Sequence, residues 1–134
     1  MSQRLITPDC SFDWTKGVND RLKGGELLGL TDELFSYAFF GADGRFTNGF
    51  TACVNHGEDI ISLLTLHPAE MAHHLRLMLD RMGTVDGYNV YANEGGPAGM
   101  TVGNHAHLHV LRRNAGEPAS GMGLGKLVTQ YNLR

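Results

Sequence analysis

A strict alternation of histidines with apolar residues constrains this chain more than any other feature. The imidazole-bearing residues are His105, His107 and His109, and the apolar residues that alternate with them are Ala106, Leu108 and Val110. A period of two is the signature of a half-buried β-strand, because successive side chains on a strand point to opposite faces. The pattern therefore predicts a strand that carries a row of imidazoles on one face and enters a core with the other.

The bulk composition predicts a soluble, globular protein. The 134 residues are 42% hydrophobic and 19% charged, which is the size and make-up of one ordinary domain. We expect a single domain over 1–134, with an N-terminal extension at 1–32 and a glycine-rich tail at 114–134. No apolar run has the length of a membrane span, and the N-terminus lacks the apolar core of a signal peptide, so we expect a cytoplasmic protein without membrane partners.

Charge and cysteine content narrow the function classes. The formal net charge is −3, so the chain has no basic field of the kind that binds nucleic acid. The two cysteines, Cys10 and Cys53, are far apart and form no C-x-x-C pair, which argues against a structural zinc site. We expect both to be thiols in a reducing compartment, and the alternative is a single disulfide between them.

Apolar patterns and glycine clusters predict an α+β domain with a mostly antiparallel sheet. Besides the histidine strand, the expected elements are a strand at 34–40, a turn at 41–44, a returning strand at 50–54, a helix at 68–82 and a strand at 88–92. The segments 1–32 and 114–134 have no pattern that assigns them.

The helix at 68–82 is the clearest of these elements. Pro68 suits a first helical turn, Glu70 complements the helix dipole, and Gly83 is a helix terminator. The spacing of its apolar residues predicts a buried stripe made of Ala72, Leu75, Leu79 and Met82. Of the adjacent pair His73 and His74, we expect one ring at the interface with the sheet and one in solvent.

The histidine row admits three interpretations. A metal site is the first, but an extended strand separates His105 from His109 by about 13 Å, too far for both to bind one zinc ion easily. A neighbouring pair would need a further ligand from elsewhere; the candidates are His56, His73 and Glu94. The second is nucleophilic catalysis at phosphorus. The third is a solvated sheet face without chemistry.

Nucleophilic catalysis gives each imidazole a role. Neutral imidazole is a good nucleophile near pH 7, so His107 could attack phosphorus while its neighbours donate hydrogen bonds or protonate the leaving group. The glycine-rich loop at 93–104 precedes the strand, and successive backbone N–H groups in such a loop can form an anion nest. A nest beside a nucleophilic histidine makes a coherent phosphate site.

These residues resemble the histidine-triad (HIT) family of nucleotide hydrolases and transferases. The signature of that family is His-x-His-x-His-x-x, with x apolar, and the chain matches it in full from His105 to Leu111. Three further segments are similar to the family, namely the run Asn93-x-Gly95…Ala98-Gly99…Val102, the trailing Arg113, and Val54-Asn55-His56 before the helix.

The resemblance implies an α+β fold with about five strands and one main helix, usually as a homodimer. It implies that His107 is the nucleophile on the α-phosphorus of a nucleotide or dinucleoside polyphosphate, with His105 and His109 assisting. The substrate-binding residues would be Asn93, Gly99 and Thr101. The reaction would cleave a phosphoanhydride or phosphoramidate bond through a covalent nucleotidyl-histidine, with no cofactor and no metal required by the nucleophile.

Three positions depart from the family pattern. Met100 stands where many members have glutamine, and Arg112 stands where proline commonly precedes the arginine. A gapless alignment from His56 places Phe40 where an acidic residue usually holds the ribose hydroxyls, with Asp43 three residues further on. These changes leave His107 untouched, and those at Phe40 and Met100 motivate an alternative in which the protein binds a nucleotide without turning it over.

Overall fold

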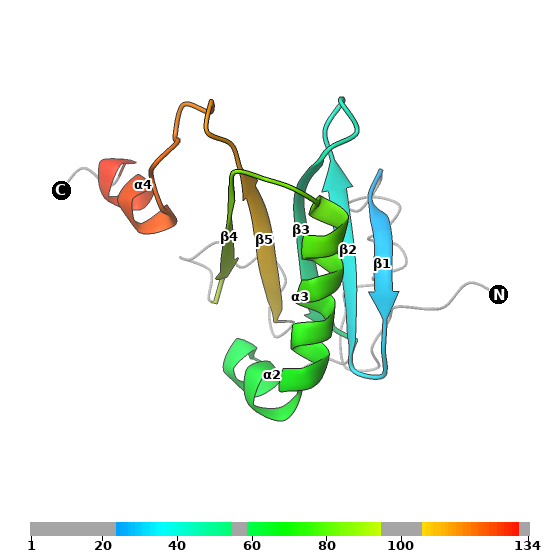
Figure 1. Cartoon of the computed structure of the whole chain (residues 1–134). Coiled ribbons are helices and arrows are strands. Elements are labelled where there is room, and N and C mark those ends of the chain that lie inside the picture. The colour runs from blue at the N-terminus through cyan, green and yellow to red at the C-terminus, as the bar shows by residue number, and fades with distance from the viewer. Residues whose placement is uncertain (1–23, 55–58, 95–105, 132–134) are drawn as a thin grey trace.

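The computed structural model describes residues 24–54, 59–94 and 106–131. Its elements, in chain order, are β1 (Glu26–Leu30), β2 (Leu34–Phe40), β3 (Phe46–Cys53), α2 (Ile60–Leu66), α3 (Pro68–Met82), β4 (Gly87–Ala92), β5 (His107–Arg113) and α4 (Leu124–Tyr131). The strands form one five-stranded sheet in the order β1-β2-β3-β5-β4, with antiparallel pairing throughout. The predicted α+β class and five-stranded antiparallel sheet are confirmed (Figure 1).

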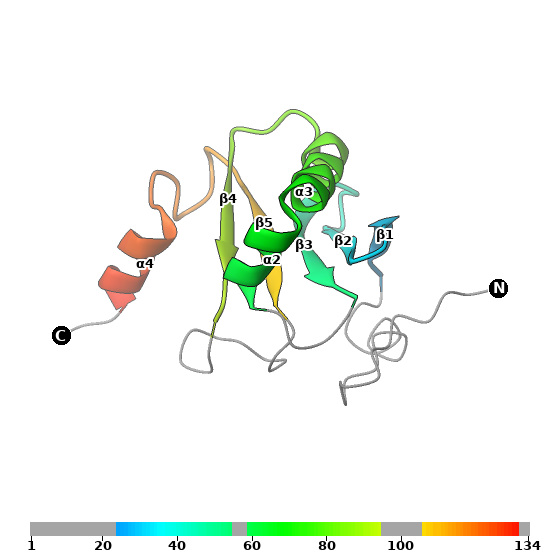
Figure 2. The ribbon, with the colours of Figure 1, turned by 90° about the horizontal axis from the view of Figure 1, so that it is seen from below.

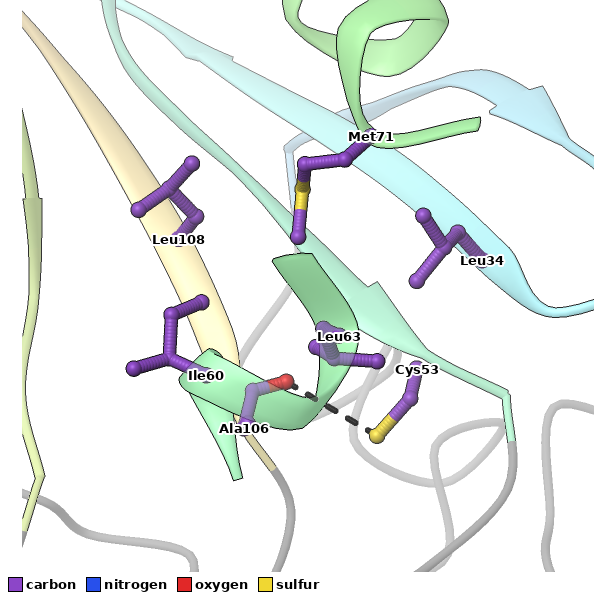
Figure 3. Close-up of a cluster of buried hydrophobic side chains, with 7 residues drawn as sticks. All are labelled: Leu34, Cys53, Ile60, Leu63, Met71, Ala106 and Leu108. Carbon is purple, nitrogen blue, oxygen red and sulfur yellow. Dashed lines mark hydrogen bonds between the residues drawn. The ribbon is translucent and has the colours of Figure 1, made fainter. Parts of the chain in front are cut away.

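Helices α2 and α3 lie on one face of this sheet (Figure 2). Beneath them is a cluster of buried side chains from the sheet, the two helices and the start of β5; its members are Leu34, Cys53, Ile60, Leu63, Met71, Ala106 and Leu108 (Figure 3). A neighbouring cluster under the C-terminal half of α3 contains Ala38, Phe46, Met78 and Val110. The α3 side of the sheet is therefore the face that the alternating apolar residues of β5 enter.

Helix α3 begins at Pro68 and ends at Met82, as the sequence predicts, and Gly83 follows with φ 73°, a conformation that glycine adopts readily. The predicted stripe is confirmed in part. Leu75, Leu79 and Met82 are half-buried and pack against the core beneath α3, whereas Ala72 is exposed. The buried residues of the helix are Met71, His74 and Met78, so hydrophobicity alone misses the histidine that occupies one of the buried positions.

One histidine of the adjacent pair is exposed and the other is buried, as the sequence predicts. His73 is exposed, and His74 is fully buried. His74 lies 2.8 Å from the hydroxyl of Ser36 through Nδ1 and 2.9 Å from that of Thr31 through Nε2. The Thr31 hydroxyl donates to Glu70 at 2.6 Å. This network is consistent with a neutral ring whose Nε2–H donates to Thr31. It joins α3 to β1 and β2 on the face opposite the histidine row.

Several elements lie in segments whose sequence pattern predicts no element or a shorter one. Strand β1 falls within the unassigned segment 1–32, and α4 falls within the glycine-rich tail. Helix α2 begins after Asp59, whose carboxylate accepts a hydrogen bond from the N–H of Ser62 at 2.7 Å. Strand β3 starts at Phe46 rather than at residue 50. The described helices number three, of which α3 is the longest, and none of them is both long and apolar enough to span a bilayer.

Candidate functional site

The histidine strand has the two faces that its alternation predicts. Ala106, Leu108 and Val110 are buried beneath the helices, with exposures of 1%, 8% and 0%. His107 and His109 are half-buried on the other face of the sheet. Strand β5 begins at His107 rather than earlier, and His105 lies outside the described residues. The structure thus places two members of the histidine row side by side.

Aromatic rings flank these two imidazoles on both sides. The ring of Phe50, on β3, lies 6.0 Å from that of His107 and 6.3 Å from that of His109, measured between centroids. On β4, the ring of Tyr91 stacks on His109 with centroids 4.9 Å apart and planes 11° from parallel. The two imidazoles meet edge to face, with centroids 4.9 Å apart at 67°. Strand pairing fixes this arrangement, because both Phe50 and Tyr91 pair with His109.

The environment of His109 keeps its ring neutral. Burial lowers the pKa of His109 to about 4, and the neighbouring His107 contributes to the lowering. The Nε2 atom of His109 is buried and has no hydrogen-bond partner within the described part of the chain. Burial also raises the pKa of Tyr91, so its phenol keeps its proton. A buried polar atom without a partner is unfavourable, and a ligand that reached it would supply the missing hydrogen bond.

The start of β5 is held by Cys53, the last residue of β3. Its backbone N–H donates to the carbonyl oxygen of Ala106 at 3.5 Å, and its thiol lies 3.8 Å from the same oxygen (Figure 3). Ala106 immediately precedes His107, and Ala52 pairs with His107 in the sheet. The position of His107 therefore depends on a buried contact on the opposite face of its own strand.

Other predicted site residues have different outcomes. Asn93 follows β4 directly and is half-buried. The carboxylate of Glu94 accepts a hydrogen bond from the N–H of Ile60 at 2.8 Å, so it serves the N-terminus of α2. Gly99 and Thr101 lie outside the described residues, as does His56. Their predicted roles stay predictions.

The metal interpretation gains no support from the described residues. They contain no group of three histidine, cysteine or acidic side chains able to hold an ion. Of the further ligands considered, His73 is exposed on α3, which covers the face of the sheet opposite His107, and Glu94 is engaged with α2.

Phe40 and Asp43 do not face the histidines. Phe40 packs on the α3 side, edge to face against Phe46, with the guanidinium of Arg81 4.5 Å above its ring. Asp43 lies in the turn between β2 and β3 and accepts a hydrogen bond from the N–H of Arg45. This turn is at the end of β3 remote from Ala52, about 20 Å away along the strand. Neither side chain is beside His107 in the structure.

Phe50 and Tyr91 were missing from the residues singled out in the sequence. Each lies in a predicted strand and faces the histidines, but the face of a strand relative to a neighbouring strand depends on register. The sequence of β4 shows only that alternate residues lie on opposite faces, with Asn89 and Tyr91 on one face and Tyr88 and Val90 on the other. It does not show which of these faces carries the imidazoles of β5.

Comparison with known proteins bears on the fold. The sequence matches no family model and no curated protein. Solved structures do match, including a Hit-like protein at TM-score 0.55 and 15% identity, covering 77% of this chain and 100% of that one. A histidine triad protein from Clostridium difficile matches at TM-score 0.51 and 16% identity, covering 85% and 95%. The chain has the HIT fold.

The same fold is embedded in a larger protein. The C. elegans NitFhit protein matches at TM-score 0.58 and 18% identity over 97% of this chain, which spans 29% of that longer protein. At these identities the comparisons establish the HIT fold, and the chemistry rests on the residues of this chain.

Proposed function

We propose that the protein is a HIT-type nucleotide hydrolase or nucleotidyl transferase that uses His107 as its nucleophile. The observation that carries the proposal is the pair His107 and His109, half-buried side by side on the face of a HIT-fold sheet opposite α2 and α3, within a complete His-x-His-x-His-x-x sequence. Half-burial leaves an imidazole accessible to a substrate and shields it from part of the solvent.

The proposed reaction has two displacements at phosphorus. A ring nitrogen of His107 uses its lone pair to form a bond to the α-phosphorus of a nucleotide, and the phosphoanhydride or phosphoramidate bond breaks. The leaving group departs with the bonding electrons and takes a proton from solvent. Water or another acceptor then attacks the nucleotidyl-histidine and releases its own proton to solvent, and the bond between phosphorus and the ring nitrogen breaks, which regenerates His107.

In this mechanism His109 acts as an uncharged hydrogen-bond donor. Its pKa of about 4 keeps it neutral at physiological pH, and its Nε2 is the buried atom that lacks a partner among the described residues. Donation of an N–H to a phosphoryl oxygen would satisfy that atom and stabilise the charge that develops on the oxygen. His105 and Thr101, with the loop containing Gly99, are proposed to complete the phosphate site, and Asn93 to position it.

The nucleobase is proposed to lie over the aromatic rings beside the histidines. Phe39 is partly buried on this face, and its ring lies 6.2 Å from that of Phe50. Stacking on an aromatic ring tolerates any base, so it does not select one. The substrate is accordingly proposed as a mononucleotide derivative or a dinucleoside polyphosphate.

A cytoplasmic homodimer is the proposed form of the protein, with no nucleic-acid partner. Strand β4 is at the edge of the sheet and leaves the side chains of Tyr88 and Val90 exposed, at 47% and 46%. Apolar residues on an edge strand are the kind of surface that pairing with a second chain would cover.

The direct test compares His107→Ala with His73→Ala on dinucleoside polyphosphates and adenosine phosphoramidate. His73 is the matched control because it is an exposed histidine on α3, across the sheet. We expect turnover to fall roughly a thousandfold or more in His107→Ala and to stay near wild type in His73→Ala. Acid quenching of the wild-type reaction should trap a nucleotidyl-histidine. Unchanged turnover in His107→Ala would remove this residue from the mechanism.

The packing of Phe40 favours one alternative, a nucleotide-binding protein without turnover. Phe40 occupies the position of the family's ribose-binding acid in the gapless alignment, yet its ring lies in the apolar cluster beneath α3. The alternative predicts saturable binding of a mononucleotide with neither product nor trapped intermediate, so the same assays separate the two functions.

A further inference from the structure

The cavity at the opposite end of the sheet from His107 is lined by cationic side chains. It has a volume of about 400 Å³ and lies between the β2–β3 turn, the C-terminal end of α3 and the loop from α3 to β4. These segments lie together at one end of the molecule (Figure 1). Its lining includes Arg45, Arg81, Thr84, Asp86 and Arg112. Its size suits a small ligand.

Arg112 is the unusual member of this lining. Its Nε atom is buried and has no hydrogen-bond partner within residues 24–54, 59–94 and 106–131. Its one hydrogen bond there is a long one, 3.4 Å from Nη1 to the carbonyl oxygen of Phe46. No described carboxylate forms an ion pair with it. A half-buried guanidinium with an unsatisfied N–H is unfavourable unless a ligand supplies the acceptor.

The next residue shows how this fold satisfies an arginine that has a structural role. The guanidinium of Arg113 donates to the carboxylate of Glu117 at 2.5 Å, to the side-chain oxygen of Asn89 at 2.6 Å and to the carbonyl oxygen of Ala119 at 2.8 Å. Arg113 thereby connects β4, β5 and the segment after β5. Arg112 has no comparable set of partners, although it is on the same strand and also half-buried.

The other charges around the cavity already have partners. Arg81 donates to Glu26 at 2.8 Å, and Arg45 lies 3.9 Å from Asp43. The carboxylate of Asp86 accepts a hydrogen bond from the N–H of Ala115 at 2.9 Å. Neither Asp86 nor Arg112 has an ion-pair partner among the described residues. What distinguishes Arg112 is that its buried Nε has no acceptor there.

We propose that this cavity is a second binding site, specific for a small oxyanion of the phosphate class, with Arg112 as its principal ligand-binding residue. A planar guanidinium matches phosphate oxygens with parallel N–H donors, and an anion in the cavity would supply an acceptor to a guanidinium that has few. The site is separate from the histidines. Arg112 is about 17 Å along β5 from His107, and its side chain is on the opposite face of the sheet.

The experiment is a titration of the isotopically labelled protein with inorganic phosphate at constant ionic strength, followed by amide NMR. Saturable shifts are expected at Gly44 and Thr84, which line the cavity. Arg112→Gln should weaken this binding roughly tenfold or more. Arg76→Gln is the matched control, because it removes the same charge from an exposed position on α3 and should leave binding unchanged.

Additional titrations identify the source of the phosphate, and a second Arg112 variant keeps the test valid if Arg112→Gln fails to fold. Adenosine monophosphate and adenosine are titrated in parallel; saturation by the nucleotide but not by adenosine assigns the site to the phosphate group. Arg112→Lys keeps the charge but loses the planar fork, and binding weaker than wild type is expected from it. The proposal is overturned if Gly44 and Thr84 do not shift saturably, or if Arg112→Gln binds phosphate as Arg76→Gln does. A shift confined to residues near His107 assigns the phosphate to the histidines and also overturns it.

Discussion

The ring of Tyr91 covers one face of His109, with centroids 4.9 Å apart and planes 11° from parallel. Removing this ring admits water to the imidazole, and desolvation is the largest cause of its low pKa. Tyr91→Ala should therefore raise the pKa of His109 from about 4 towards the ordinary value of about 6.5. The shift is measured by NMR titration of the imidazole C–H signals.

Tyr91→Phe separates stacking from the phenol group. Phenylalanine keeps the aromatic face, so the pKa of His109 should stay near its wild-type value in this variant. If Tyr91→Ala leaves that pKa unchanged, the stacked ring is not what shields His109. If both variants raise it equally, the phenol is responsible instead.

Acid should destabilise this protein through its buried histidines. Burial lowers the pKa of both His74 and His109 to about 4, whereas an unfolded histidine titrates near 6.5. The unfolded state therefore binds more protons as the pH falls from 6.5 to about 4, and the free energy of unfolding decreases over that window by up to ~3 kcal/mol per histidine. Above pH 7 these two groups contribute no pH dependence.

The contribution of His74 to the pH dependence of stability is measured with the variant His74→Gln, which keeps a polar side chain without a titratable ring. Urea unfolding at pH 7.5, 6.0 and 5.0 should give a smaller loss of stability in the variant than in wild type. Carboxylates titrate mainly below pH 5, the lowest of these three values, so they do not obscure the difference. If the free energy of unfolding changes equally with pH in the two proteins, His74 is protonated alike in the folded and unfolded states.

The network around His74 should contribute measurably to stability at neutral pH. Thr31 connects Glu70 and His74 through one hydroxyl, at 2.6 and 2.9 Å. Thr31→Val keeps the shape but leaves the fully buried His74 without its Nε2 partner, which should lower the free energy of unfolding by about 1–3 kcal/mol. Thr65→Val is the control, since Thr65 is exposed on α2 and bonds only within its own helix. Equal midpoints of urea unfolding in the two variants would contradict the prediction.

Local sequence signals predicted the elements that have strong patterns of their own. The alternation at His107–Val110 gave the two faces of β5, and Pro68 with Gly83 gave both ends of α3. The strand at 34–40 is confirmed residue for residue. In each of these segments the local preference and the tertiary environment favour the same structure, so local sequence is sufficient.

The remaining elements depend on contacts that sequence patterns do not record. The N-terminus of α2 needs Glu94, which is 34 residues away in the chain, as well as its own Asp59. Strand β1 pairs with β2 with a break in register between Leu27 and Gly29, so its alternation is interrupted. In the site, the stacking of Tyr91 on His109 follows from the pairing of β4 with β5, and register between strands is set by the whole sheet.

Gly49 gives a test of how tightly the sheet holds the histidine strand. A Cβ at this position would lie 2.7 Å from the backbone oxygen of Tyr37 and 3.1 Å from both the sulfur of Met78 and the ring of Phe46. The backbone oxygen belongs to a paired central strand and cannot withdraw without loss of pairing. Gly49→Ala should therefore lower the free energy of unfolding by about 1–3 kcal/mol through overpacking.

The same substitution should change the surroundings of the imidazoles on β5. Gly49 pairs with Val110, and the next residue, Phe50, pairs with His109, so a displaced β3 moves one wall of the imidazole pair. We expect the imidazole C–H signals of His109 to shift in Gly49→Ala, together with a lower midpoint of urea unfolding. Gly116→Ala is the control, because a Cβ there meets open space. Should the two variants unfold at the same midpoint, β3 has more freedom to move than its contacts indicate.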